Sequence, residues 1–465
     1  MYGSDRPLRT AAGMLMKETA ELARYAATCR YEDIPPDVVE RAKQCITDTV
    51  AAVVFGYDLP WSRMIVAFAE KNGAGGGSRI LGSDAARVHA PAAALANGAL
   101  AHAFEMDNLT WPNTGVHPGA TLLASGLAVA QERRSGGRDL ITATVAGAEV
   151  MIRIGRATQH SNEGRGFHAP GTTGPFGAAV TCGKLMGFDA ECTQNALGIA
   201  GSLACGLLEF ARAGNGAMVK RLHLGRAAEG GVLAASLAGE GFTGPASVLE
   251  GEFGFLRVFC GSKFDARELT RGLGESYATR SIMLKRFPCH ITAHTSVQAV
   301  LDLRARHRYG AADVAAIHIA GNDKMARVNN IPSPADIMMA QYSIPFCVAL
   351  AHVRDPRDPR SFDEGALRDA QIRSLAERVT ITIAEDRPTP LAAGVTVTLK
   401  DGRVLTRCVT DFKGTPEQPL DRGELREKFL MLTRHCRPDH MGDMFDRLQN
   451  LEHESNLDWV GVGEP

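Results

Sequence analysis

The sequence is poor in aromatic residues and has no excess of charge of either sign. Aromatic residues make up 6% of the 465 residues, and 51 lysines and arginines face 52 aspartates and glutamates, for a net charge of −1. A balanced charge argues against binding to nucleic acid or to a membrane surface through bulk charge. We therefore expect a small-molecule partner, with no nucleic acid and no membrane among the partners.

Long hydrophobic runs and paired cysteines are absent as well. The longest apolar runs, such as residues 142–151, are short and interrupted by polar residues, so we expect no membrane-spanning segment. Residues 1–22 contain no long apolar region of the signal-peptide kind, so we expect no secretion signal. The ten cysteines are scattered without a C-x-x-C pair, which is typical of a reducing compartment. These absences predict a soluble cytoplasmic protein.

Length and hydrophobic patterning predict two domains, because 465 residues exceed what one compact core usually holds. Apolar residues recur at helical intervals through most of the first half of the chain. Strand-like alternation begins only after residue 314, at 315–321, 378–386 and 394–412, and the last segment contains an Asp-Gly hairpin signal. We predict a mainly α fold with a large helical domain at 1–274, a smaller α+β domain at 275–410 and a return to the helical domain at 411–465.

The stretch HAFEMDNLTWPNTGVHPG, residues 102–119, concentrates polar side chains between two expected helices. It brings Glu105 and Asp107 close in sequence to His117, and Pro118 suits the first position of the second helix. His117 would therefore stand at the positive end of a helix, where free backbone N–H groups favour a bound anion. Two acids, an imidazole and a helix N-terminus in one loop indicate a site for a small carboxylic acid.

Four further stretches carry polar groups to the ends of helices: 164–173, 218–226, 285–294 and, more weakly, 322–332. Removal of a proton next to a carboxylate needs a positioned base and nearby positive charge or N–H groups for the developing enolate-like anion. Imidazoles near neutral pKa supply the first requirement, and lysines and helix N-termini supply the second. The candidates are the bases His117, His168 and His290, the cations Lys220, Arg221, Lys285 and Arg286, and the acids Glu105 and Asp107.

Simpler interpretations compete with this one. Each Lys-Arg pair can be a solvated surface feature. His102 lies in an alanine-rich segment that predicts a hydrogen-bonded core histidine, and Asp107 can cap a turn. His290 and His294 stand four apart, on a helix that we expect to start at Pro288, but no HExxH glutamate accompanies them, so we expect no metal.

Two sequence motifs of catalytic interest are excluded. The glycine run GAGGGS at 73–78 lacks a following Lys-Ser/Thr pair and a preceding strand, so it predicts a flexible turn rather than a phosphate-binding loop. No G-x-S-x-G element occurs, which gives no support to a serine nucleophile.

Several long motifs resemble the MmgE/PrpD family. They are HAFEMDN followed by HPG, GFHAPGTTGPFGAA, MVKRLHLGRAAEGGVLAASLAGEGFTGP, LEGEFGF and LKRFPCHITAHTSVQAVLDL, and they occur in the family's order over nearly the whole chain. The family includes 2-methylcitrate dehydratase, cis-aconitate decarboxylase and iminodisuccinate epimerase. The resemblance implies a large helical domain with a smaller α+β lid, an active site between them, a homodimer, and chemistry on small di- or tricarboxylates without a cofactor.

The resemblance also implies which residues form the site. Carried over position by position, the decarboxylase-like residues are Glu105, His117, His168, Lys220, Lys285 and His290. We add Asp107 to the catalytic group, and Thr110 and Arg221 to the substrate-binding group. The KRFPCH segment resembles the cis-aconitate decarboxylases more than other members.

Three features depart from the family pattern. The usual Asp-Phe-Asp-Asp is replaced by Glu105-Met106-Asp107-Asn108, and the spacing to His117 is about one residue longer. A tyrosine expected in the lid of the decarboxylases has no clear match, although Arg327 lies nearby in NDKMARVNN. These departures leave the reaction class standing and open the question of the substrate.

Three functional hypotheses follow. The preferred one is a lyase, either a dehydratase or a decarboxylase, in which His117 or His168 moves a proton at the carbon α to a carboxylate. Lys220 and Lys285 would bind carboxylates, and His290 would close the site from the lid. The second is an epimerase of an iminodisuccinate-like compound, and the third is a non-catalytic carboxylate-binding protein.

Overall fold

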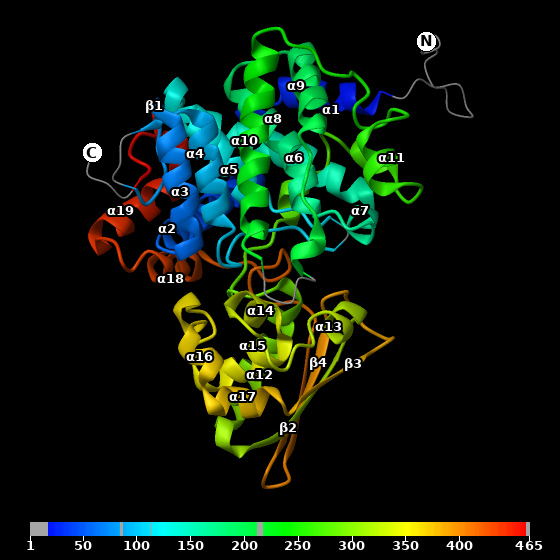
Figure 1. The fold of residues 1–465 in the computed structure, drawn as a ribbon, viewed down its shortest axis with the longest axis vertical. Helices are drawn as coiled ribbons and strands as arrows, with labels where there is room; N and C mark the ends of the chain where they lie inside the picture. The colour runs from blue at the N-terminus through cyan, green and yellow to red at the C-terminus, as the bar shows by residue number, and fades with distance from the viewer. Residues whose placement is uncertain (1–16, 84–86, 113, 212–216, 462–465) are drawn as a thin grey trace.

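The computed structural model describes residues 17–83, 87–112, 114–211 and 217–461. Residues 1–16, within the segment where we expect no secretion signal, and Asn113 in the central loop lie outside this description. The chain forms a helical body, at the top of Figure 1, and a smaller part with helices and a sheet below it. The mainly α fold with a smaller α+β part is confirmed.

The body is built from the first eleven α-helices and from two later ones. α4, α5, α6, α8 and α10 pack against one another at its centre (Figure 1). The residues of α4 from Ala93 to Ala101 are all buried, because small side chains let neighbouring helices approach on every side. The helices are α1 (Glu18–Thr28), α2 (Pro36–Tyr57), α3 (Pro60–Gly73), α4 (Ala90–Ala101), α5 (Pro118–Arg133), α6 (Gly137–Thr158), α7 (Ser161–Gly164), α8 (Ala169–Leu185), α9 (Ala190–Ser202), α10 (Val219–Gly239) and α11 (Phe255–Cys260).

The contact between α4 and α10 is so close that it requires glycine. A Cβ atom at Gly225 of α10 would lie 2.3 Å from the carbonyl oxygen of Leu95, and one at Gly98 of α4 would lie 2.9 Å from the Cα of Gly225. This contact holds the end of α4 and the start of α10 together, and both lead into the candidate site.

Gly225→Ala is therefore expected to destabilise the protein by about 1–3 kcal/mol, the usual effect of overpacking a tight core. The matched control is Gly230→Ala on the same helix, where the new Cβ would meet Leu203 at an ordinary 3.5 Å. The control should be neutral or stabilising by up to about 1 kcal/mol, because alanine favours helix over glycine. Urea unfolding of the two variants measures the difference, and equal stabilities would contradict the close approach.

The lower part, called the lid from here on, comprises six helices and a four-stranded sheet. The sheet order is β3-β2-β4-β5, with β2 and β3 parallel and the other pairs antiparallel. The expected strands and the hairpin between β4 and β5 are confirmed. The lid elements are α12 (His294–His307), β2 (Val314–Gly321), α13 (Asp323–Arg327), α14 (Ile337–Tyr342), α15 (Ile344–Val353), α16 (Glu364–Arg368), α17 (Ala370–Ala376), β3 (Val379–Ile383), β4 (Ala393–Leu399) and β5 (Val404–Val409).

Three local predictions were wrong. The glycine run is not a turn but strand β1 (Ala74–Ser78), since a Cβ at Gly76 would lie 2.2 Å from the backbone nitrogen of His89 and only glycine permits that pairing. α8 begins at Ala169, four residues before the expected start near Thr173. The helix expected from Pro288 begins only at His294, after a 3₁₀ turn, so His290 and His294 do not share a helix face.

The last two helices, α18 (Arg422–Leu432) and α19 (Pro438–Gln449), pack against α2. A buried ion pair joins α18 to α2, with Lys428 Nζ 2.5 Å from Asp48 Oδ1. The domain boundaries at 274/275 and 410/411 stay a prediction. Within the described ranges no single helix is both long and apolar enough to cross a membrane, although α2 and α3, bent by 96°, pass that test as a pair.

Candidate active site

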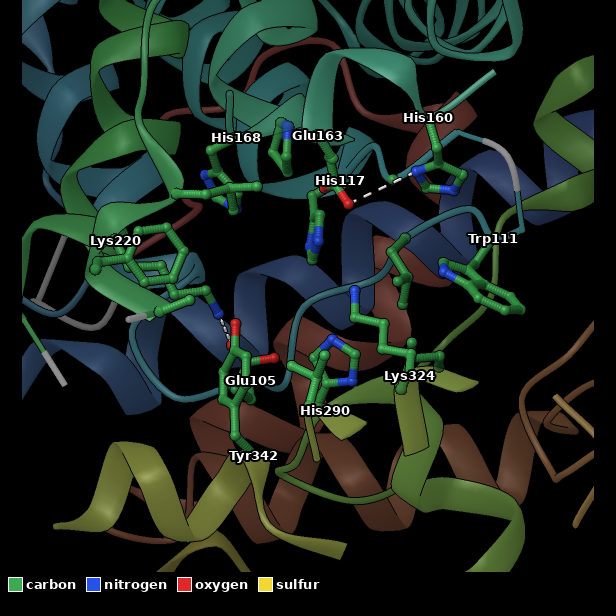
Figure 2. A pocket seen from close by; sticks show the side chains of 18 of the residues that line it. Glu105, Trp111, His117, His160, Glu163, His168, Lys220, His290, Lys324 and Tyr342 are labelled. Atoms are coloured by element: carbon green, nitrogen blue, oxygen red, sulfur yellow. Dashed lines mark ion pairs between the residues drawn. The ribbon is translucent and has the colours of Figure 1, made fainter. Parts of the chain in front are cut away.

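A cavity of about 630 Å³ lies between the body and the lid, and polar side chains from both parts line it. Figure 2 shows these side chains pointing toward a common space. The volume suits a small-molecule site, and several titratable groups converge there. The lining includes Glu105, Trp111, His117, His160, Glu163, His168, Lys220, Lys285, His290, Lys324 and Tyr342.

The central loop is held in place at both ends. α4 ends at Ala101, and His117 directly precedes α5, which begins with Pro118 as the sequence predicts. Asn108 fixes the loop between them, because its side-chain nitrogen donates to Thr49 Oγ1 at 3.0 Å and its oxygen accepts from the backbone N–H of Gly119 at 2.9 Å. A carboxylate could not donate the first of these bonds, which accounts for the amide at this position.

Asp107 lies between two imidazoles in the interior. Its Oδ2 is 2.6 Å from Nδ1 of His117 and 3.0 Å from Nδ1 of His102. Burial raises the pKa of Asp107, but the two histidines outweigh it and hold the pKa well below its usual value. Since Nδ1 of His117 is engaged, its Nε2 is the nitrogen available to the cavity that His117 lines. Asp107 therefore orients an imidazole instead of capping a turn.

His102 completes this buried chain of polar groups. Its ring is fully buried, and burial lowers its pKa to about 3, so the imidazole is neutral at pH 7. Within the described residues Nε2 of His102 and Oδ1 of Asp107 have no hydrogen-bond partner, so the predicted core histidine is only half satisfied. One donor atom from each of His102, Asp107 and His117 lies within 4.8 Å of the others, a spread that a metal ion could bridge. The separations of 2.6 and 3.0 Å equally match hydrogen bonds, and the expected absence of metal stays a prediction.

Glu105 joins two lysines at one end of the cavity, and Figure 2 shows its contact with one of them, Lys220. Its Oε2 is 2.7 Å from Nζ of Lys285, and its Oε1 contacts Nζ of Lys220. All three side chains are buried. Two ammonium groups around one carboxylate leave a net positive charge, which favours an anionic ligand. Burial, followed by the positive charges of Lys285, Arg221 and Lys324, lowers the pKa of Lys220.

The backbone of Glu105 is in the left-handed region, with φ of 57°. A glutamate rarely adopts this conformation, which costs of order 1 kcal/mol and persists only where the surroundings enforce it. Such outliers gather at functional sites, and here the conformation directs the carboxylate to both lysines.

His168 and His290 approach the cavity from opposite parts of the molecule. His168 directly precedes α8, and its Nδ1 is 2.9 Å from Nδ1 of His223 on α10. His290 comes from the lid, and its Nδ1 is 2.9 Å from Oγ1 of Thr292. Burial lowers the pKa of both histidines well below the usual value, with help from His102 and His223 at His168. Both imidazoles are therefore neutral at pH 7.

Two predicted substrate-binding residues do not line the cavity. The guanidinium of Arg221 stacks over Trp61 at 4.2 Å, and its Nε donates to the carbonyl of Ala103 at 3.0 Å. Thr110 is buried within the central loop, with its Oγ1 2.6 Å from Oγ1 of Thr114. Arg221 thus supports the end of α4, and Thr110 supports the loop.

Sequence reasoning missed Tyr342, Lys324, Glu163 and His160. Tyr342 lies at the end of α14, its ring 5.0 Å from Nζ of Lys220 and 4.9 Å from the ring of His290. The lid therefore does present a tyrosine to the cavity, whereas Arg327, the residue nearest the expected position, is exposed and paired with Asp323. No local pattern marks Tyr342, and only the packing of α14 beneath Lys220 brings it to the site.

Comparison with known sequences agrees with this architecture. The MmgE/PrpD N-terminal domain matches residues 20–267, and the MmgE/PrpD C-terminal domain matches residues 287–450. The chain belongs to the MmgE/PrpD family. The family resemblance inferred from the motifs is therefore confirmed.

Relatives within the MmgE/PrpD family extend over most of the chain. A cis-aconitate decarboxylase of Aspergillus terreus is 29% identical over 444 residues, which cover 89% of this chain and 89% of the relative. The cis-aconitate decarboxylase of Homo sapiens is 27% identical over 436 residues, covering 90% and 88%. That of Mus musculus is 25% identical over 431 residues, covering 90% and 86%.

The neutral buried histidines of this MmgE/PrpD site predict a stability that falls in mild acid. His102, His168 and His290 have lowered pKa values when folded, whereas unfolded histidine titrates near pH 6.5. Below about pH 6.5 the unfolded chain binds protons that the folded chain does not, so each histidine removes about 1.4 kcal/mol of stability per pH unit.

Urea unfolding between pH 8 and pH 5 measures this loss. His102→Gln should unfold with a shallower pH slope than the wild type, by about one proton, because one of the contributing imidazoles is gone. A free energy of unfolding that stays constant from pH 7 to pH 5 would contradict neutral imidazoles in the folded protein.

Proposed function

We propose that this protein is a lyase that removes CO₂ from cis-aconitate or a closely similar tricarboxylate. The observation that carries the proposal is the cavity in which Lys220 and Lys285, bridged by Glu105, lie with His117, His168 and His290. The relatives named cis-aconitate decarboxylase support the reaction class, since they match nearly the whole chain. The protein is therefore an enzyme of the lyase type.

The reaction needs a proton and places for negative charge. When the carboxylate on the methylene carbon of cis-aconitate leaves as CO₂, the electrons of the broken C–C bond form a new double bond to the central carbon. The original double-bond pair then takes a proton at the carbon α to the remaining terminal carboxylate. One proton enters and one CO₂ leaves, so electrons balance without an oxidant or reductant.

His117 is the group we assign to deliver that proton. Asp107 fixes its ring through Nδ1, and Nε2 is left for the substrate. A positioned acid of this kind typically accelerates a reaction by about 10²- to 10⁴-fold. His168, which is neutral, lies farther along the same wall and accepts or donates a hydrogen bond to a substrate carboxylate.

The positive charges stabilise the transition state. Lys220 and Lys285 bind the carboxylate conjugated with the developing enolate-like anion, where charge increases during the reaction. The N-termini of α5 and α8 add backbone N–H dipoles beside His117 and His168. His290 contributes a neutral ring from the lid and limits access of water.

The test is proton NMR of the purified protein with cis-aconitate, 2-methylcitrate, citrate and iminodisuccinate. We expect loss of the vinyl proton signal of cis-aconitate and growth of the two methylene signals of itaconate. Loss of water from 2-methylcitrate would assign a dehydratase instead, and scrambling of a stereocentre in iminodisuccinate would assign an epimerase. No change in any of the four compounds would overturn the proposal.

We also propose that the enzyme is a homodimer, as the family resemblance implies, and that it is located in the cytoplasm, as the scattered cysteines indicate. Light scattering of the purified protein measures the assembly directly. A mass equal to one chain would contradict the dimer.

A further inference from the structure

Lys324 brings a third ammonium group to the cavity, and its environment differs from that of the other two. It lies on α13 of the lid, is half-buried and points into the space between lid and body (Figure 2). Lys220 and Lys285 both contact Glu105. Across the described ranges, by contrast, no carboxylate oxygen lies within 4.0 Å of Nζ of Lys324, and this group makes no hydrogen bond.

Glu163 is the acid opposite Lys324. It lies on α7 of the body and pairs with His160, whose Nδ1 is 3.7 Å from Glu163 Oε2. Burial raises its pKa, but the contact with His160 and the charge of Lys324 outweigh this and lower the pKa to about 2. Glu163 is therefore a fixed negative charge on the cavity wall.

The field of Lys324 reaches groups on both sides of the cavity. It lowers the pKa of Lys220 on α10 and that of His290 in the lid, and it acts on Glu163. Lys324 lines the same cavity as Lys220, Glu163 and His290. One end of the cavity carries Lys220 and Lys285 around Glu105, α13 of the lid carries Lys324, and the remaining wall carries Glu163.

We propose that Lys324 is a specificity-determining residue that binds the third carboxylate of the substrate, while Glu163 repels carboxylates from its own wall. This inference rests on the proposed function and adds the class of acid and its orientation. A tricarboxylate would place two carboxylates near Lys220 and Lys285 and one at Lys324. A dicarboxylate that lacks the carboxylate held by Lys324 would leave that ammonium group without an anionic partner.

The expected loss of affinity follows from the hydrogen bond between Lys324 and a substrate carboxylate that the substitution removes. A hydrogen bond between charged partners typically contributes enough to change affinity by about 10- to 100-fold. Lys324→Gln should therefore raise KM for cis-aconitate by about 10- to 100-fold and change kcat much less, because the side chain binds the substrate and does not deliver the proton. Lys324→Arg should recover most of the loss.

Three dicarboxylates identify which carboxylate Lys324 holds. Glutaconate lacks the central carboxylate of cis-aconitate, citraconate lacks that on the methylene carbon, and itaconate lacks that on the vinyl carbon. Binding of cis-aconitate and of all three is measured by calorimetry with wild type and Lys324→Gln. We expect the variant to lose affinity for cis-aconitate and for two of the three, and to bind the third as the wild type does.

The matched control is Arg327→Gln, which removes an exposed cation from the same helix. It should bind every acid as the wild type does. Equal weakening of all four acids by Lys324→Gln would indicate a structural role and overturn the proposal, as would affinities unchanged from wild type.

Glu163→Gln distinguishes a carboxylate-binding role of Lys324 from a role in which Lys324 only holds lid and body together through Glu163. If Glu163 repels carboxylates, its removal should strengthen binding of cis-aconitate a few-fold. If Lys324 instead holds the lid closed against Glu163, both single variants should weaken binding and the double variant should be no worse, which would overturn the proposal. Calorimetry detects binding whether or not the acid is converted. A wild-type protein that binds these acids but converts none of them would therefore refute the proposed function and leave the binding role of Lys324 intact.

Discussion

Replacing His117 with alanine is expected to lower kcat for cis-aconitate by about 10²- to 10⁴-fold, the contribution of a positioned proton donor. The substrate would still meet Lys220 and Lys285, so KM should change far less than kcat. The ring packs at the surface of the cavity and not in the hydrophobic core, so the variant should fold. Stopped assays of product formation and circular dichroism measure the two properties.

Substitutions of Asp107 and His102 should lower kcat less than His117→Ala does. Asp107→Asn preserves the shape but removes the carboxylate that accepts from Nδ1 of His117 and orients its ring, so kcat should fall by at least about 10-fold. His102→Gln keeps a donor toward Asp107 and should have the smallest effect on kcat. A His117→Ala enzyme with kcat near wild type would remove this residue from the mechanism, and His168 would become the candidate donor.

Glu105→Ala is expected to reduce the free energy of unfolding by about 3–5 kcal/mol, the usual effect of removing one partner from a buried ion pair. The substitution would leave Lys220 and Lys285 buried without their shared carboxylate. It would also leave a non-glycine residue with φ of 57° without the contacts that hold it there. Urea unfolding measures the loss.

An exposed ion pair supplies the control. Asp323→Ala removes the partner of Arg327, where both side chains are about seventy per cent exposed, and it should cost less than about 1 kcal/mol. A Glu105→Ala protein as stable as Asp323→Ala would mean that the lysines are hydrated or neutral in the folded protein. Added cis-aconitate should stabilise Glu105→Ala more than Asp323→Ala, because a bound carboxylate replaces the missing one.

Much of the site was predictable because its residues stand at the ends of helices. Pro118 marks the start of α5, so the placement of His117 before it followed from the chemistry of proline. The alanine-rich segment before His102 predicted a helix that packs on all sides, and the hairpin at Asp401 and Gly402 was visible from its dipeptide. The family motifs then linked these separate loops to one cavity.

The rest depends on contacts between distant parts of the chain. Lys285 and Lys220 share Glu105 only because lid and body are joined as they are, and no spacing in the sequence encodes that pairing. The role of Asp107 depends on how the sixteen-residue loop between α4 and α5 folds back on itself, which local propensity does not determine. In the sequence Gly76 predicts a flexible turn, whereas in the fold its missing side chain lets β1 approach His89 closely.

The central claim is that His117 supplies a proton to the carbon α to a carboxylate as CO₂ leaves. The most direct measurement is turnover of cis-aconitate in D₂O, with NMR used to locate deuterium in the product. We predict one deuterium per molecule, on the saturated methylene carbon of itaconate that was the vinyl carbon of the substrate, and none on the new terminal methylene. Deuterium on the terminal methylene, or deuterium entering cis-aconitate without loss of CO₂, would contradict the mechanism.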